Sequence, residues 1–103
     1  MDETFDFLIG RWNVTKAKEI TKGRSPKGMV SVNDLSKYLG VMRIDKDHAK
    51  NTDVTKPIIC ILVDEYALPI DGWHRIYRAH QEGIEYIEAH VLTKEESDSI
   101  RIT

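Results

Sequence analysis

The chain has 103 residues, of which 41% are hydrophobic and 31% are charged, and its formal net charge is −2 at pH 7. This length and composition are typical of one folded domain and exclude a chain that is disordered throughout. The longest uninterrupted apolar run covers Ile58 to Val63 and is far shorter than the roughly 20 residues of a transmembrane helix. A single cysteine, Cys60, cannot form an internal disulfide. We therefore expect a soluble cytoplasmic protein with no membrane partner.

Positive charge is concentrated in the first quarter of the chain. Between Gly10 and Val30 one glutamate accompanies six basic residues, which are Arg11, Lys16, Lys18, Lys22, Arg24 and Lys27. Such a stretch can contact nucleic-acid phosphates, and the alternative is a solvated arm that only keeps the protein soluble. The same region holds apolar residues that need a packing partner, namely Phe5, Phe7, Leu8, Ile9, Trp12 and Val14. We expect residues 1–28 to form a basic segment packed on a domain of residues 29–103.

The next residues predict one short strand and two short helical stretches. Met29 to Val32 is typical of a strand. A short amphipathic helix that ends near Gly40 is predicted by the helical spacing of Leu35, Tyr38, Leu39 and Met42. Asp45 to Asn51 can form a further helical turn.

A β-hairpin is the clearest prediction in the second half of the chain. Pro57 breaks any preceding helix, and Ile58 to Val63 then runs without a polar residue, which is typical of a strand buried on both faces. The next two residues can form a turn, and Tyr66 to Ile70 can return as the second strand. Pro69 requires a position in that strand where no backbone donor is needed.

The hairpin leads into a helix. Asp71 and Gly72 precede a run of helix formers from Trp73 to Glu82, and Gly83 follows the run. This order of a capping residue, helix formers and a terminal glycine predicts a helix of about three turns.

A strand and a closing helix complete the chain. Apolar and polar residues alternate within Ile84 to Leu92, which predicts a half-buried strand. Thr93 is followed three residues later by Glu96, a capping-box pattern that begins a short helix. The predicted fold class is α+β, with a single small domain, a mixed β-sheet and a few short helices.

The junction between the hairpin and the following helix is a candidate anion site. The first turn of a helix presents unpaired backbone N–H groups and the positive end of the helix dipole. Gly72 lets the backbone approach a ligand, Arg75 offers a bidentate fork to phosphate oxygens, and His74 can donate from its imidazole. The alternative is a plain helix cap. In that case Arg75 pairs with a nearby carboxylate, which is that of Asp71, Glu82 or Glu85.

The same part of the chain resembles the ParB/sulfiredoxin superfamily. The likeness rests on Lys56 to Val63 and on Ile70 to Ala79, with Asp71 to Arg75 and Arg78-Ala79 as its most specific part. In that superfamily a strand beginning Pro-Ile leads through a hairpin into an Asp/Gly-Gly-x-His/Arg-Arg loop, a helix and a further strand. The resemblance covers about residues 29–96 and implies a ParB/sulfiredoxin-like fold.

The resemblance also implies a ligand. Members of the superfamily bind CTP or ATP with Mg²⁺, and their phosphates lie at the glycine-containing loop. By this likeness Gly72, His74 and Arg75 contact the phosphates, Asp71 forms the turn, and Arg78 belongs to the same site.

Trp73 is included in the candidate nucleotide site because an indole there can stack on a base or sugar, with packing in the core as the alternative. Sulfiredoxin has its reactive cysteine at this position, so repair of a sulfinic acid by that route is excluded here. Cys60 does not replace that cysteine. Its position within an apolar run predicts a buried thiol with a raised pKa.

Two classes of function remain open. The first is a nucleotide-binding ParB-like domain of small phage or plasmid type. Whether it acts as an NTPase, a DNA-acting nuclease or a small-molecule kinase is undecided, because no residue can be assigned as the catalytic group. The second is a nucleic-acid or protein interaction module without catalysis that uses the basic residues 10–30. No metal site is expected at the histidines, which are His48, His74, His80 and His90.

Overall fold

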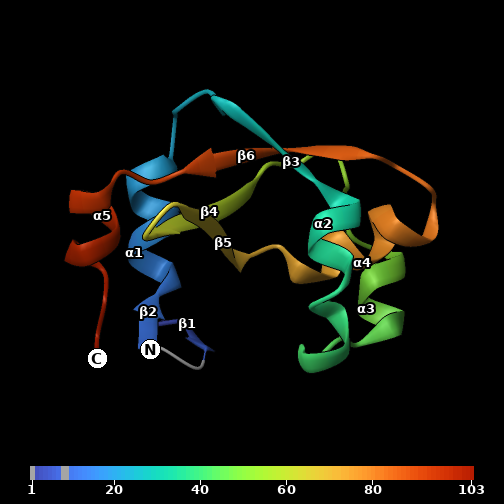
Figure 1. The fold of residues 1–103 in the computed structure, drawn as a ribbon, viewed down its shortest axis with the longest axis horizontal. Coiled ribbons are helices and arrows are strands. Elements are labelled where there is room, and N and C mark those ends of the chain that lie inside the picture. Colours follow the sequence, from blue (N-terminus) through green and yellow to red (C-terminus); the bar gives the residue numbers. More distant parts are fainter. Residues whose placement is uncertain (1, 8–9) are drawn as a thin grey trace.

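The structure is a computed structural model that describes residues 2–7 and 10–103, so Leu8 and Ile9 lie outside the described residues. The strands are β1 (Thr4–Phe7), β2 (Gly10–Asn13), β3 (Gly28–Ser31), β4 (Ile58–Val63), β5 (Tyr66–Asp71) and β6 (Tyr86–Val91). The helices are α1 (Val14–Thr21), α2 (Val32–Ser36), α3 (Lys46–Lys50), α4 (Trp73–Gln81), α5 (Lys94–Ser99) and a 3₁₀ turn, η1 (Leu39–Val41). The predicted α+β class, with a mixed sheet and several short helices, is confirmed (Figure 1).

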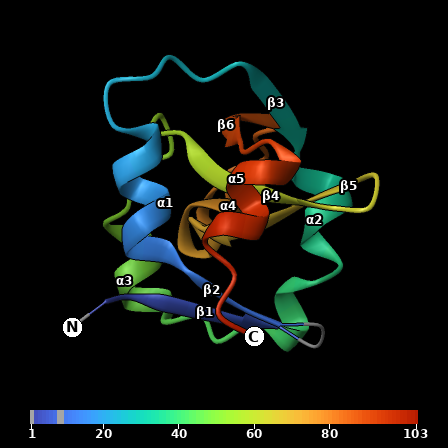
Figure 2. The same ribbon diagram turned by 90° about the vertical axis from the view of Figure 1, so that its left-hand side faces the viewer.

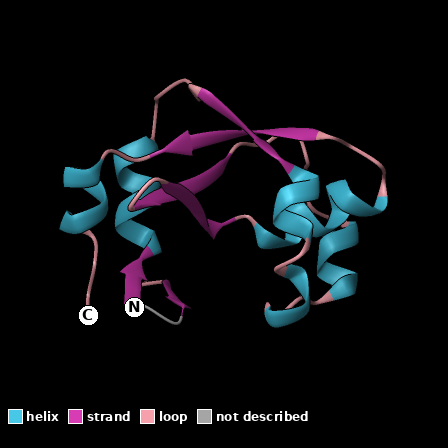
Figure 3. Cartoon of the chain, viewed as in Figure 1, coloured by secondary structure: helices cyan, strands magenta, loops and turns pink. Residues whose placement is uncertain are grey.

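The main sheet has the strand order β3-β6-β4-β5 (Figure 3). β4 is parallel to β6 and antiparallel to β5, and β3 is antiparallel to β6. The predicted hairpin is confirmed, with Val63 opposite Tyr66 and Asp64 in the turn at φ 55°. Pro69 lies on β5, at the edge of the sheet, where a missing backbone donor is tolerated.

β4 is buried on both faces, as its apolar sequence predicts. Ile58 and Cys60 belong to one cluster of buried residues, core A, with Val32, Leu35, Trp73, Ile76, Ala79, Ile87 and Ala89. Ile59 and Ile61 belong to a second cluster, core B, with Trp12, Val14, Ala17, Ile70, Leu92 and Ile100. Core A therefore lies under α2 and α4, whereas core B is covered by α1, β2 and the C-terminal segment.

The N-terminal segment is one layer of the domain. Trp12 is 2% exposed and forms a β-bridge with Arg101. The Asn13 amide donates to the Ile100 carbonyl at 2.9 Å. Arg24 pairs with Glu96 at 2.6 Å, and this pairing, with the bond from the Thr93 amide, lowers the pKa of Glu96 to about 2. Figure 2 shows α1, β1 and β2 beside α5 and the C-terminus.

The region after β3 differs from the predicted amphipathic helix that ends near Gly40. The structure has α2 at Val32–Ser36 and the separate turn η1 at Leu39–Val41. α2 begins early because the Ser31 hydroxyl accepts from the Asp34 amide at 3.2 Å and caps the helix. It ends early because the Tyr38 amide donates to the Leu35 carbonyl, a tighter i→i−3 bond that interrupts the α-helix.

The other predicted elements are confirmed with small shifts at their ends. Asp45 caps α3, and the predicted strand of residues 84–92 is observed as β6. α5 begins with the predicted capping box between Thr93 and Glu96. Ser97 ties α5 to β4, because its buried hydroxyl accepts from the Leu62 amide at 3.1 Å. No helix in residues 2–7 and 10–103 is long and apolar enough to cross a membrane.

Candidate anion site at the start of helix α4

The predicted junction is present, but its cap differs from the expected one. Asp71 is the last residue of β5 rather than part of a separate turn, and Gly72 is the N-cap of α4 with φ 109°. Gly72 has no side chain to offer, and the described residues show no side-chain cap hydrogen bond at the N-cap of α4. The amides at the start of the helix therefore remain available to a ligand.

Gly72 is required by packing as well as by its backbone conformation. A Cβ atom on this residue would overlap Ile58 Cγ2 and lie 2.9 Å from Ile58 Cβ. The positive φ would strain any side chain as well. The start of α4 therefore packs directly on β4.

Arg75 is directed toward the protein itself. Its guanidinium donates to the Lys56 carbonyl at 3.3 Å, to the Pro57 carbonyl and to Asp71 Oδ2 at 3.0 Å. The side chain is only 15% exposed. The sequence left this pairing with Asp71 open as the alternative to an anion site. Together with the two carbonyl contacts, the pairing joins the loop before β4 to the start of α4.

Lys18 joins this pair from the basic segment. Its Nζ lies 2.8 Å from Glu3 Oε1 and 3.9 Å from Asp71 Oδ1. The bond to Glu3 is the main reason that the pKa of Lys18 is raised. Two cations and two carboxylates, from β5, α4, α1 and the residue before β1, thus form one network.

Arg78 and Trp73 also have contacts within the fold. Arg78 Nε donates to Glu82 at 2.7 Å, and its Nη1 donates to the Thr52 carbonyl. Trp73 is 6% exposed in core A, and its indole N–H donates to the Pro69 carbonyl at 2.8 Å. Trp73 therefore packs in the core, which the sequence left as the alternative to stacking on a base. Hydrogen bonds from Trp73, Arg75 and Arg78 thus connect α4 to the rest of the fold at several points along its length.

His74 lies against α3. Its Nε2 accepts from the Asp45 amide at 3.1 Å, and its ring meets the His48 ring edge-on, with 4.7 Å between centroids. Burial lowers the pKa of His74, and the neighbouring His48 lowers it further, whereas Asp45 opposes the shift. The neutral imidazole is therefore the form that this contact favours.

A cavity of about 720 Å³ opens at this junction. Its walls come from residues 70–74, from residues 3–6 around β1, and from residues 41–43 after η1. It thus contains Gly72, Trp73 and His74 together with the carboxylates of Glu3, Asp6 and Asp71. Arg43 stands on the wall with an exposed side chain and has no ion pair among the described residues. Sequence reasoning missed Arg43, because it lies in no motif and comes near Gly72 only through the fold.

The basic segment is partly neutralised. Arg11 pairs with Asp6 at 2.6 Å, Lys18 with Glu3, and Arg24 with Glu96. The side chains that remain exposed, with no ion pair in the described part of the chain, are those of Lys16, Lys22 and Lys27. The structure therefore brings only Lys18 of this segment to the α4 junction.

Cys60 is buried, and burial raises the pKa of its thiol to about 12, which confirms the sequence prediction. Within residues 2–7 and 10–103, no group of three or more His, Cys, Asp or Glu side chains could hold a metal ion.

Comparisons with known proteins add no relative. No family model, no curated protein and no solved structure matches this chain.

Replacing Gly72 by alanine tests the packing of the junction. We expect G72A to lower the free energy of unfolding by about 2–4 kcal/mol, since it adds both a strained φ and a clash with Ile58. The matched control is G83A, where φ is 72° and no atom lies within 4 Å of the added Cβ. That variant is expected to lose only about 1 kcal/mol. Equal losses in urea denaturation would contradict the close approach of Gly72 to β4.

The contact of His74 with Asp45 predicts a pH-dependent stability. A histidine in the unfolded chain has a pKa of about 6.5, and the pKa of His74 is lower in the folded protein. The unfolded chain therefore binds this proton more readily, and stability should fall as the pH drops through about 6.5 and level off below the folded pKa. Urea denaturation between about pH 7.5 and 5.5 should show a weaker dependence for H74Q. The exposed control H80Q should keep the dependence, and an unchanged slope in H74Q would refute the assignment.

Proposed function

We propose that the cavity at the start of α4 binds the phosphate groups of a nucleotide that is complexed with Mg²⁺. The observation that carries the proposal is the first turn of α4, which has no side-chain cap and opens into a cavity of about 720 Å³. Backbone N–H groups at a helix N-terminus are good ligands for phosphate. The resemblance of residues 56–79 to the ParB/sulfiredoxin superfamily supports the same ligand, CTP or ATP.

Arg75 has a different role in this proposal from the phosphate contact that the sequence predicts. Arg75 is held by Asp71 and two backbone carbonyls, so it positions the loop and the helix start rather than extending to the ligand. Arg43 takes the place of the exposed cation, because its side chain stands on the cavity wall without an ion pair among the described residues. His74, the second residue of α4, also lines this cavity.

The carboxylates of the cavity affect whether the nucleotide binds with or without Mg²⁺. Glu3, Asp6 and Asp71 are each held in an ion pair, with Lys18, Arg11 and Arg75 respectively, so their repulsion of phosphate oxygens is reduced. Mg²⁺ accepts carboxylate and phosphate oxygens together and usually arrives with the phosphates of a nucleotide. Because these carboxylates are already paired within the fold, the Mg²⁺ would be held mainly by the phosphates of the nucleotide. The proposal concerns binding, since no described side chain is placed as the base or nucleophile of a hydrolysis.

Calorimetric titration of CTP, ATP and GTP with Mg²⁺ tests the proposal. We expect one of them to bind, and R43Q to weaken that affinity by about fivefold to tenfold, because a charge-assisted contact to phosphate is lost. K27Q is the matched control, since it removes one exposed positive charge that lies outside the cavity. Absence of binding by all three nucleotides would refute the proposal. An equal effect of R43Q and K27Q would show that only net charge matters.

A second candidate is a nucleic-acid interaction module, and the exposed lysines of the N-terminal layer favour it. Lys16 and Lys22 belong to α1 and its C-cap, and Lys27 follows them before β3. All three side chains are exposed and lack an ion pair in the part of the chain that the structure describes. Lysines of this kind bind phosphates by displacing counterions, without reading a sequence.

DNA retention measured against salt concentration tests the second candidate. We expect affinity to fall steeply with salt, and the triple variant K16Q/K22Q/K27Q to reduce the slope of log K against log salt by about 2–3. The matched control K46Q/K50Q/K56Q removes the same charge around α3 and should leave the slope nearly unchanged. Retention that is equal in the two triple variants would contradict a specific role for the N-terminal layer.

A further inference from the structure

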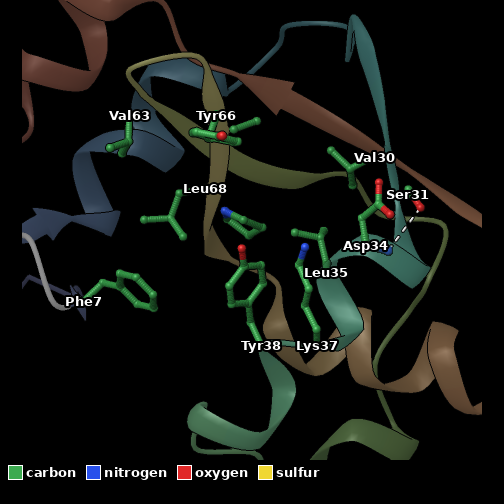
Figure 4. A pocket seen from close by; sticks show the side chains of 12 residues that line it. Phe7, Val30, Ser31, Asp34, Leu35, Lys37, Tyr38, Val63, Tyr66 and Leu68 are labelled. Carbon is green, nitrogen blue, oxygen red and sulfur yellow. Dashed lines mark hydrogen bonds between the residues drawn. The ribbon is translucent and has the colours of Figure 1, made fainter.

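A second cavity lies between β5 and α2 (Figure 4). Its volume is about 520 Å³, within the range of pockets that hold small organic ligands. No residue lines both this cavity and the one at α4. The inference drawn from it is therefore independent of the proposed nucleotide site.

The walls of this cavity are mainly apolar and come from separate parts of the chain. Val30 of β3 and Leu35 of α2 form one side, and Leu68 of β5 forms the other, with Phe7 of β1 at one end. Ala67 of β5 also lines the cavity. Apolar walls contributed by separated elements create a concave surface that favours an apolar ligand group, because its burial removes surface from water.

Two hydrogen-bond donors stand at the α2 side of the cavity. Figure 4 shows the Lys37 ammonium and the Tyr38 hydroxyl pointing toward β5 from the two residues that follow α2. Lys37 Nζ lies 5.4 Å from the centroid of the Tyr38 ring and has no ion pair within the described residues. Asp34, one turn earlier on α2, lies beside Ser31 and forms no ion pair with Lys37 among the described residues. The cavity therefore combines apolar walls with one ammonium group that has no ion pair among the described residues.

Two tyrosines border the cavity with much of their surface in water. Tyr66 is 77% exposed and Tyr38 is 41% exposed. A tyrosine has an apolar ring and a polar hydroxyl, so it can cover a ligand that is apolar at one end and hydrated at the other. The exposed rings thus favour the same kind of ligand as the walls.

We propose that this cavity binds a small amphipathic carboxylate. The apolar part of the ligand, an aromatic ring system or a short acyl chain, packs between Leu35 and Leu68. Its carboxylate accepts from the Lys37 ammonium and the Tyr38 hydroxyl. An anion is favoured over a cation because two donors face the same space, whereas Asp34 is the one acidic side chain of the cavity wall.

The test uses 2-naphthoate as the charged probe and 2-naphthylmethanol as its uncharged counterpart. Titration into the full chain, followed by ¹H–¹⁵N NMR spectra, should shift amides of residues 30–38 and 63–68 with naphthoate. K37Q should weaken naphthoate by about threefold to fivefold, the loss expected for one partly exposed ion pair, and should leave the alcohol unchanged. K27Q, which removes a charge outside this cavity, should change neither.

A second variant keeps the test decisive if K37Q alone has a small effect. A67L places a larger side chain on the cavity wall and should weaken both probes by more than about tenfold, since it occupies the ligand volume. ¹H–¹⁵N spectra of each variant confirm that the fold is retained. Shifts spread over the whole surface, binding that A67L does not affect, or equal affinity of K37Q and wild type for naphthoate would each overturn the proposal.

Discussion

The burial of β4 on both faces is the constraint on which the rest of the structure depends. Ile58 and Ile59, neighbours on this strand, face different clusters of buried residues, so two separate layers must cover it. One layer is α2 with α4, and the other combines the N-terminal segment with the end of the chain. The same strand fixes the candidate anion site, because Gly72 packs on Ile58 and Arg75 binds the carbonyl of Pro57 just before β4. The first turn of α4 is therefore positioned by the core rather than by a flexible loop.

Ion pairs within the fold decide which charges remain for a ligand. Arg75 and Lys18 share Asp71, and Arg24 is held by Glu96. A cation that already has a carboxylate partner offers a phosphate less, because the existing pair must first be broken. The groups left for recognition are the backbone amides of α4 and the few side chains without an ion pair, such as Arg43. Counting basic residues in the sequence overstates the positive surface for this reason.

Local signals in the sequence predicted most of the elements, and contacts between distant residues account for what it missed. The β4–β5 hairpin, α4 with its glycines and the capping box of α5 are each specified by neighbouring residues. The apolar spacing from Leu35 onward predicts one short helix that ends near Gly40, because this spacing does not show that Ser31 caps α2 early. The partners of the site are remote in sequence: His74 bonds Asp45, and Arg75 bonds Pro57. Such pairs depend on tertiary packing. Sequence spacing therefore identified Arg75 as a candidate ligand residue but did not show that its side chain binds other residues of the protein.

β5 borders both cavities, and the chemistry changes along its length. Tyr66 to Pro69 line the apolar cavity, whereas Ile70 and Asp71 line the polar one beside the start of α4. Binding at the polar end would rest on charge and should weaken as salt screens it. Binding at the apolar end would rest mainly on buried surface, with a single cation adding selectivity, so salt should affect it far less. The two ends of this edge strand would thus favour ligands with different physical driving forces, because one end faces α2 and Lys37 and the other faces Arg43 and the start of α4.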